Sequence, residues 1–148
     1  MMVTEINVTD YLAMLETRRV LDRLIAGKAA KRATPDQRAA LGDILLRMKA
    51  VAKKEDTATF MRLDRACDEL LELASRNPYA ANALTPLHAH CRRFWYCYQH
   101  ESDLMKSAKL HESMIESVIV GNEQAAARDA DAIIDYLESF ARSSMDLL

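Results

Sequence analysis

The segment LDRACDELL, residues 63–71, places two acidic side chains one helical turn apart in an otherwise largely apolar run. On a helical wheel Asp64 falls just inside the apolar stripe and Asp68 lies at its border. His111 falls near the centre of the apolar stripe of a later segment. At least one carboxylate and one imidazole are therefore expected in the interior, where an unpaired carboxylate must be protonated, hydrogen-bonded, ion-paired or metal-bound.

Two kinds of chemistry account for these three side chains. Two carboxylates and an imidazole supply part of a ligand shell for a divalent ion such as Zn²⁺ or Mn²⁺. An ion pair with Arg18, Arg92 or Arg93 explains the two acids equally well. For the histidine, a hydrogen-bonded position in the core is the ordinary alternative. The spacing alone leaves both interpretations open.

Other chemistry-bearing residues give weaker indications. His88 and Cys91 are three residues apart and can share a helix face, but Cys97 lies on another face and the chain has no CxxC pair. Arg92, in the segment CRRF, can present a guanidinium to an anionic ligand. The aromatic run FWYCY at residues 94–98 is typical of a core and a dimer surface, because no basic groove accompanies it as base stacking on nucleic acid would require.

The apolar spacing that must position these side chains is helical along the whole chain. Thr34, Pro35 and Gln37 form the start signal of a helix with a capping box, and Pro86 lies inside the fourth helix, where it can cause a kink. The first expected helix covers about residues 10–32. The second begins at residue 35 and frays in the segment AKKEDT at 52–57, and the third begins at residue 56 or 57 and ends at the segment SRNP at 75–78. The last three cover about residues 78–99, 102–120, and 123 to the C-terminus. The sequence therefore predicts an all-α fold, an antiparallel six-helix bundle with a central ligand pocket.

Length and composition limit the functional classes. A chain of 148 residues is expected to form one domain, and its net charge of −2 supplies no basic field for binding nucleic acid over a whole face. No run of about 18 apolar residues and no signal peptide is present, which favours a cytoplasmic protein without membrane contact. The three cysteines are then expected to be free thiols. No GxSxG, P-loop or HExxH motif supplies an enzyme's nucleophile or base.

Three segments in order resemble a known family. They are DYLAMLETRRVLDRLIAGKAAKRAT at 10–34, with an E-x-R pattern at Glu16 and Arg18, then LDRACDELLELASRNP at 63–78, and LHESMIESVIVGNEQAAARDA at 110–130. They are similar to the opening helix, the D-x-x-F-H segment with its Ser-x-Asn helix end, and the later H-x-x-(I/L) segment of the FCD domain. This is the C-terminal effector-binding domain of FadR-type GntR transcriptional regulators, and the likeness covers nearly the whole chain.

The resemblance implies a metal site, with departures. The family commonly holds a divalent ion through an Asp, a His four residues later, a further His, and a last His 22 residues beyond that. Asp64 matches the first position, Asp68 stands where a His is usual, His111 matches the third, and Ile133 occupies the fourth. The resemblance thus implies a site for Zn, Mn or Ni at Asp64, Asp68 and His111, altered or lost at Ile133. If the metal site has been lost, the two acids would instead bind a cationic effector or form an ion pair with an arginine.

The resemblance also implies function and partners. A small-molecule effector, by family default a small organic acid, would bind inside the bundle, with Arg18 and Arg92 as candidates for anchoring its anionic group. The domain would form a homodimer and act on DNA only through a winged helix-turn-helix domain that this chain lacks. Residues 1–9 are then expected to be a linker remnant, and residues 10–148 the effector-binding domain. The rival interpretations are a metal-dependent helical-bundle enzyme and a metal-free structural or interaction module.

Overall fold

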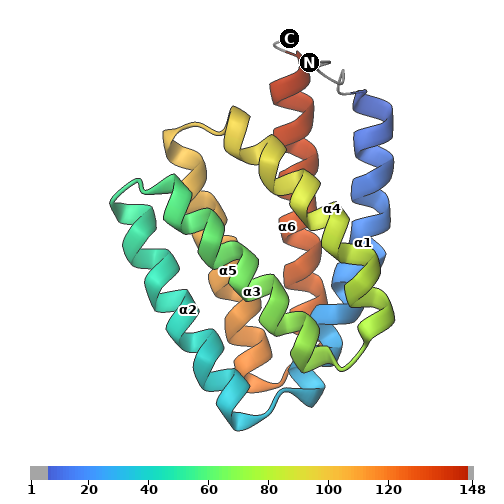
Figure 1. Ribbon diagram of the computed structural model, residues 1–148, viewed down its shortest axis with the longest axis vertical. Coiled ribbons are helices and arrows are strands. Elements are labelled where there is room, and N and C mark those ends of the chain that lie inside the picture. The colour runs from blue at the N-terminus through green and yellow to red at the C-terminus, as the bar shows by residue number, and fades with distance from the viewer. Residues whose placement is uncertain (1–6, 147–148) are drawn as a thin grey trace.

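The computed structural model describes residues 7–146, and in them the fold is all-helical, as the sequence predicts. The six described helices are α1 (Val8–Arg32), α2 (Pro35–Lys53), α3 (Thr57–Ser75), α4 (Pro78–Tyr98), α5 (Glu101–Val120) and α6 (Glu123–Asp146), joined by short loops into a bundle (Figure 1). Helix α1 begins two residues earlier than expected, because the Asn7 side chain accepts a hydrogen bond from the Asp10 backbone N–H. Most of the expected linker at residues 1–9 lies outside the described residues.

Local signals set the helix ends where the sequence places them. The capping box that starts α2 is confirmed: the Gln37 backbone N–H donates to the Thr34 hydroxyl at 3.1 Å, and the Thr34 backbone N–H donates to the Gln37 side chain at 2.9 Å. Helix α5 ends at Gly121, whose φ of 80° is in the left-handed region that favours glycine. Pro86 lies inside α4, which continues through it.

Helix α1 is in contact with several helices of the bundle. It packs along α6 over much of its length and also contacts α3, α4 and α5 (Figure 1). Helix α2 packs on the outside, against α3 and α5. Because α1 has neighbours on several sides, polar residues near its middle are carried into the interior together with fully buried apolar residues such as Leu15.

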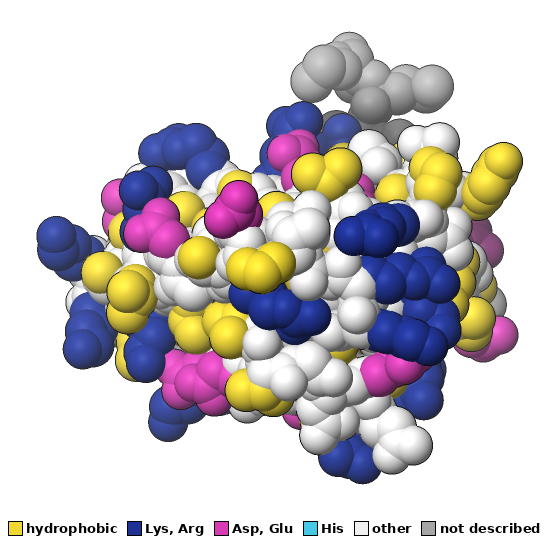
Figure 2. Space-filling view, turned by 90° about the horizontal axis from the view of Figure 1, so that it is seen from below, with side chains coloured by type: hydrophobic (Ala, Val, Ile, Leu, Met, Phe, Trp, Pro, Cys, Tyr) yellow, Lys and Arg dark blue, Asp and Glu magenta, His cyan; other side chains and the backbone are white. Residues whose placement is uncertain are grey.

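The outer surface is mixed in charge. Figure 2 shows one end of the bundle, where basic side chains gather on one side and acidic and apolar side chains lie among them. None of the described helices combines the length and the apolar character that crossing a bilayer requires.

Candidate functional site

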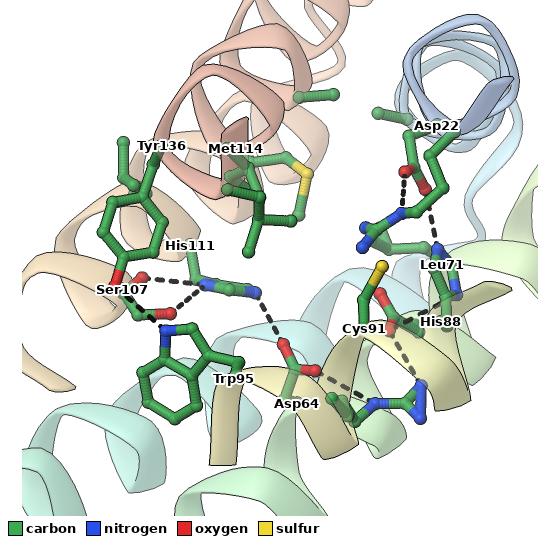
Figure 3. Close-up of a pocket in the computed structure, with 18 of the residues that line it drawn as sticks. Asp22, Asp64, Leu71, His88, Cys91, Trp95, Ser107, His111, Met114 and Tyr136 are labelled. Carbon is green, nitrogen blue, oxygen red and sulfur yellow. Dashed lines mark hydrogen bonds and ion pairs between the residues drawn. The ribbon is translucent and has the colours of Figure 1, made fainter. Parts of the chain in front are cut away.

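A cavity of about 70 Å³ lies inside the bundle, between α1, α3, α4, α5 and α6 (Figure 3). A cavity of this size holds only a few water molecules or a small ligand. Among its lining residues are all five side chains proposed from the sequence: Arg18, Asp64, Asp68, Arg92 and His111. The structure therefore brings together in one cavity residues that come from four different helices.

Asp64 and His111 meet directly across the cavity, from α3 and α5. The His111 Nε2 atom lies 2.8 Å from the Asp64 carboxylate, and its Nδ1 atom lies 2.7 Å from the Ser107 carbonyl oxygen (Figure 3). Both of these oxygens only accept hydrogen bonds, so both ring nitrogens of His111 donate. Burial would lower the pKa of His111, but the hydrogen bond with Asp64 and the charge of that acid raise it. The contacts of His111 thus favour its protonated form, paired with Asp64.

Arg92, on α4, joins the two acids of α3. Its Nε donates to Asp64 and its Nη2 donates to Asp68, each at 3.1 Å. Burial would raise the pKa of Asp64, but the hydrogen bond and charge of His111, with the charge of Arg92, hold it at about 2. Burial raises the pKa of Asp68 to about 6, and the nearby charge of Asp64 adds to this effect. One guanidinium therefore bridges two carboxylates that would otherwise repel each other.

A second polar group faces the same cavity from α1 and α4. Asp22 accepts a hydrogen bond from Arg18 Nε at 2.8 Å and lies 2.8 Å from His88 Nε2. The other ring nitrogen of His88 lies 3.4 Å from both Asp68 and Glu72; it is buried and has no hydrogen-bond partner among the described residues. Burial would lower the pKa of His88, but the charge of Asp68, the hydrogen bond with Asp22 and the nearby Glu72 raise it to about 10.

The third wall is aromatic and comes from α4 and α6. Trp95 Nε1 donates to the Tyr136 hydroxyl at 2.9 Å (Figure 3). This hydroxyl in turn donates to Asp103 at 2.9 Å. Asp103 also accepts the backbone N–H of His100 at 2.7 Å, at the start of α5. Ile133, in α6, is 9% exposed and lines the cavity.

The comparison with protein families gives one match: the model of the FCD domain matches residues 13–136, most of the chain. The chain belongs to the FCD domain family. No curated protein matches it. It is thus similar to the effector-binding regulatory domain of GntR-type regulators, and the five residues proposed from the sequence all lie within the matched region.

The metal site implied by this family can be tested against the side chains present in this FCD domain. Ile133 offers no donor atom, His111 uses Nε2 on Asp64, and Arg92 uses one oxygen of each acid. Among the side chains of residues 7–100 and 102–145, no group of three or more His, Cys, Asp or Glu is placed to hold a metal ion. As arranged, these side chains do not fit a bound divalent ion.

The cavity is also less acidic than its two sequence-predicted aspartates suggest. Its carboxylates are balanced by two guanidinium groups and two imidazoles, in a set formed by Arg18, Asp22, Asp64, Asp68, His88, Arg92 and His111. We call these seven residues the interior cluster. An anionic ligand therefore does not meet a uniformly negative wall.

Sequence reasoning did not find Asp22, and it considered His88 only as a metal ligand beside Cys91. The available signal was the spacing of Arg18 and Asp22, four residues apart on one helix face. Cys91 does not join His88 in a ligand group; it is a buried free thiol that lines the same cavity. Trp95 and Tyr136 were also missed as lining residues.

Proposed function

We propose that this FCD domain binds a small anionic effector in its interior cavity and that Arg18 is the anchor. The observation that carries the proposal is the burial of this guanidinium in the cavity wall with only part of its hydrogen-bonding capacity used. Arg18 is 8% exposed and lines the cavity, and its Nε is held by Asp22. Among the described residues, the guanidinium of Arg18 makes its hydrogen bond to an oxygen atom through Nε, and the Cys91 thiol lies beside it, so its two terminal nitrogens are available to the oxygen atoms of a ligand.

The chemistry of the cavity supports a carboxylate as the anionic group. A guanidinium whose Nε is fixed still presents a fork of donors that matches a carboxylate, and charge-assisted bonds of this kind are strong when buried. Arg92, the other candidate anchor, is already engaged by Asp64 and Asp68. Apolar walls such as Phe60 and Leu71 would pack against the carbon skeleton of a small organic acid.

The same residues suggest how binding becomes a signal. Arg18 and Asp22 lie on α1, whereas His88 and Arg92 lie on α4 and the paired acids on α3. A ligand that draws Arg18 toward itself changes the balance of contacts between α1 and the α3–α4 side of the cavity. We propose that this shift is passed through α1 to a winged helix-turn-helix domain, in a cytoplasmic homodimer that contacts DNA through that domain.

Thermal and urea unfolding with a panel of small carboxylic acids tests the proposal. Each acid is compared with its uncharged amide, and wild type is compared with Arg18→Met and with Arg19→Met, which changes the neighbouring arginine on the surface. An acid at 100 times its Kd stabilises the folded state by about 2.7 kcal/mol. We expect this response in wild type and R19M, and none in R18M measured against its own ligand-free stability.

Two results would count against the proposal. One is the absence of a response to every acid tested, and the other is a response that survives in R18M. The first result would favour the structural or interaction module, because an interior cluster with balanced charges can also serve only to hold helices together. Size-exclusion chromatography with light scattering tests the proposed homodimer separately.

A further inference from the structure

Arg92 contacts both of the acids to which the family resemblance assigns a metal site. Asp64 and Asp68 are one turn apart on α3, and their side chains are only 16% and 17% exposed. Two carboxylates this close need a cation, since solvent screens them poorly. Arg92 reaches them from the facing helix and gives each acid one hydrogen bond at 3.1 Å, through different nitrogens.

We propose that the Arg92 guanidinium takes the place of a divalent ion at this acid pair, and that it blocks a latent metal site made by Asp64, Asp68 and His111. A metal ion would compete for these carboxylates, because Arg92 holds one oxygen of each acid and His111 holds the other oxygen of Asp64. It would also place a second positive charge next to the guanidinium. The proposal concerns the resting domain and does not require that an effector binds.

The local geometry explains why the site is latent and not lost. The Nδ1–H of His111 donates to the Ser107 carbonyl oxygen at 2.7 Å, which turns Nε2 toward Asp64. A backbone carbonyl in this role is a common outer-shell partner of metal-binding histidines, because it fixes the ring and leaves Nε2 to the metal. Without Arg92, His111 Nε2 would still lie 2.8 Å from the Asp64 carboxylate, with Asp68 one helical turn away on α3.

Ile133 is a second departure from the family's metal-site pattern, beside the engagement of the two acids by Arg92. It lines the cavity from α6, is 9% exposed, and brings an apolar side chain to the wall where the family's fourth ligand is expected. Arg92 therefore supplies the positive charge that the acid pair needs, while Ile133 withholds the ligand that would strengthen metal binding. The two residues act on different requirements of a metal site, so their effects can be separated by mutation.

Calorimetric titration of the full chain with Ni²⁺ or Zn²⁺, and Co²⁺ absorption spectra, test this inference. The variants are Arg92→Ala, Ile133→His, the double variant, and Arg93→Ala as the matched control, because Arg93 is the exposed neighbour on the same helix. We expect wild type, R93A and I133H to bind these ions weakly and alike. R92A should bind at least tenfold more tightly than wild type, and R92A/I133H at least a hundredfold more tightly.

Three outcomes would overturn the inference. The first is tight stoichiometric binding by wild type that Asp64→Asn abolishes. The second is binding by R92A/I133H that is no tighter than by wild type. The third is I133H binding as tightly as the double variant, which would show that Arg92 blocks nothing. If the variants without Arg92 do not fold, I133H still decides, because it retains Arg92 and tight stoichiometric metal binding by it would show that Arg92 blocks nothing. Effector titrations in the presence of a chelator keep this inference separate from the proposed function.

Discussion

Two groups of charged residues, one inside the bundle and one on its surface, each include an arginine from neighbouring positions of α1. Arg18 belongs to the interior cluster and is 8% exposed. Arg19 points outward, with a side chain 28% exposed, and pairs with acids of α6. We call the second group the surface cluster, and its members are Arg19, Arg23, Asp131, Asp135 and Glu138.

The comparison shows that similar ion pairs contribute differently to the free energy of unfolding, depending on how far they are buried. Exposed pairs contribute about 0–1 kcal/mol each, because water and salt screen them and the side chains lose entropy. A buried pair contributes little compared with an apolar replacement of both partners, yet removing one partner leaves an uncompensated charge and is strongly destabilising. The interior cluster is therefore expected to be sensitive to single substitutions, and the surface cluster tolerant of them.

The largest effect is expected for Asp22→Ala. This substitution leaves Arg18 and His88 as cations without their shared acid in a poorly solvated site, and we expect it to lower the free energy of unfolding by about 3–5 kcal/mol. Urea unfolding followed by circular dichroism measures the change.

Asp43→Ala is the control for this experiment. Asp43 pairs with Arg47 at the same i, i+4 spacing, but their side chains are 60% and 68% exposed, so a change within about 0.5 kcal/mol is expected. Equal losses in the two variants would remove the distinction between interior and surface pairs.

A pH dependence is the next effect, on the order of a few kcal/mol. The pKa of His88 is raised from 6.5 to about 10 in the folded state, so its contribution to stability is complete below pH 6.5 and is lost as the pH rises through 10. The facing groups are Arg18 and Asp22 on α1, Asp68 and Glu72 on α3, and Arg92 on α4. Unfolding between pH 6 and 10 should show a steeper loss of stability in wild type than in His88→Gln.

His90→Gln provides the reference for that comparison, since His90 is exposed on the same helix. It should keep the wild-type slope of stability against pH. If H88Q and wild type follow parallel curves across this range, the charge on His88 does not stabilise the fold.

The sequence predicted the features that depend on local signals, and it did not predict those that depend on which helices pack against each other. Local rules placed the six helices, as the Thr34 capping box shows, and the helical wheel correctly turned Asp64 and His111 inward. The choice of Arg92 as partner of the two acids stayed open, because a wheel does not say which helices face each other. Asp22 was missed because its pairing with Arg18 looks like an ordinary surface pair until α1 is seen among its neighbours.

A smaller effect is expected at the aromatic wall of the cavity. Tyr136→Phe keeps the ring but removes the hydroxyl that accepts from Trp95 and donates to Asp103, which we expect to cost about 1–2 kcal/mol. Trp95 is the single tryptophan of the chain, so its fluorescence reports the lost hydrogen bond as well as unfolding. Tyr96→Phe, at a residue 51% exposed, should leave both readouts unchanged. A silent Y136F would mean that this network does not contribute to stability.

The smallest effect is expected for Arg19→Ala in the surface cluster. Arg19 contacts Asp131, Asp135 and Glu138, at 3.2, 2.7 and 3.3 Å, yet we expect its removal to cost no more than about 1 kcal/mol at low salt. The loss should fall further when NaCl is raised to about 0.5 M, because salt screens exposed charges. Urea unfolding at both salt concentrations, with D22A measured in parallel, makes the contrast quantitative. If the loss in R19A exceeds 3 kcal/mol or resists salt while D22A responds to it, the surface cluster rather than the interior one holds α1 in place.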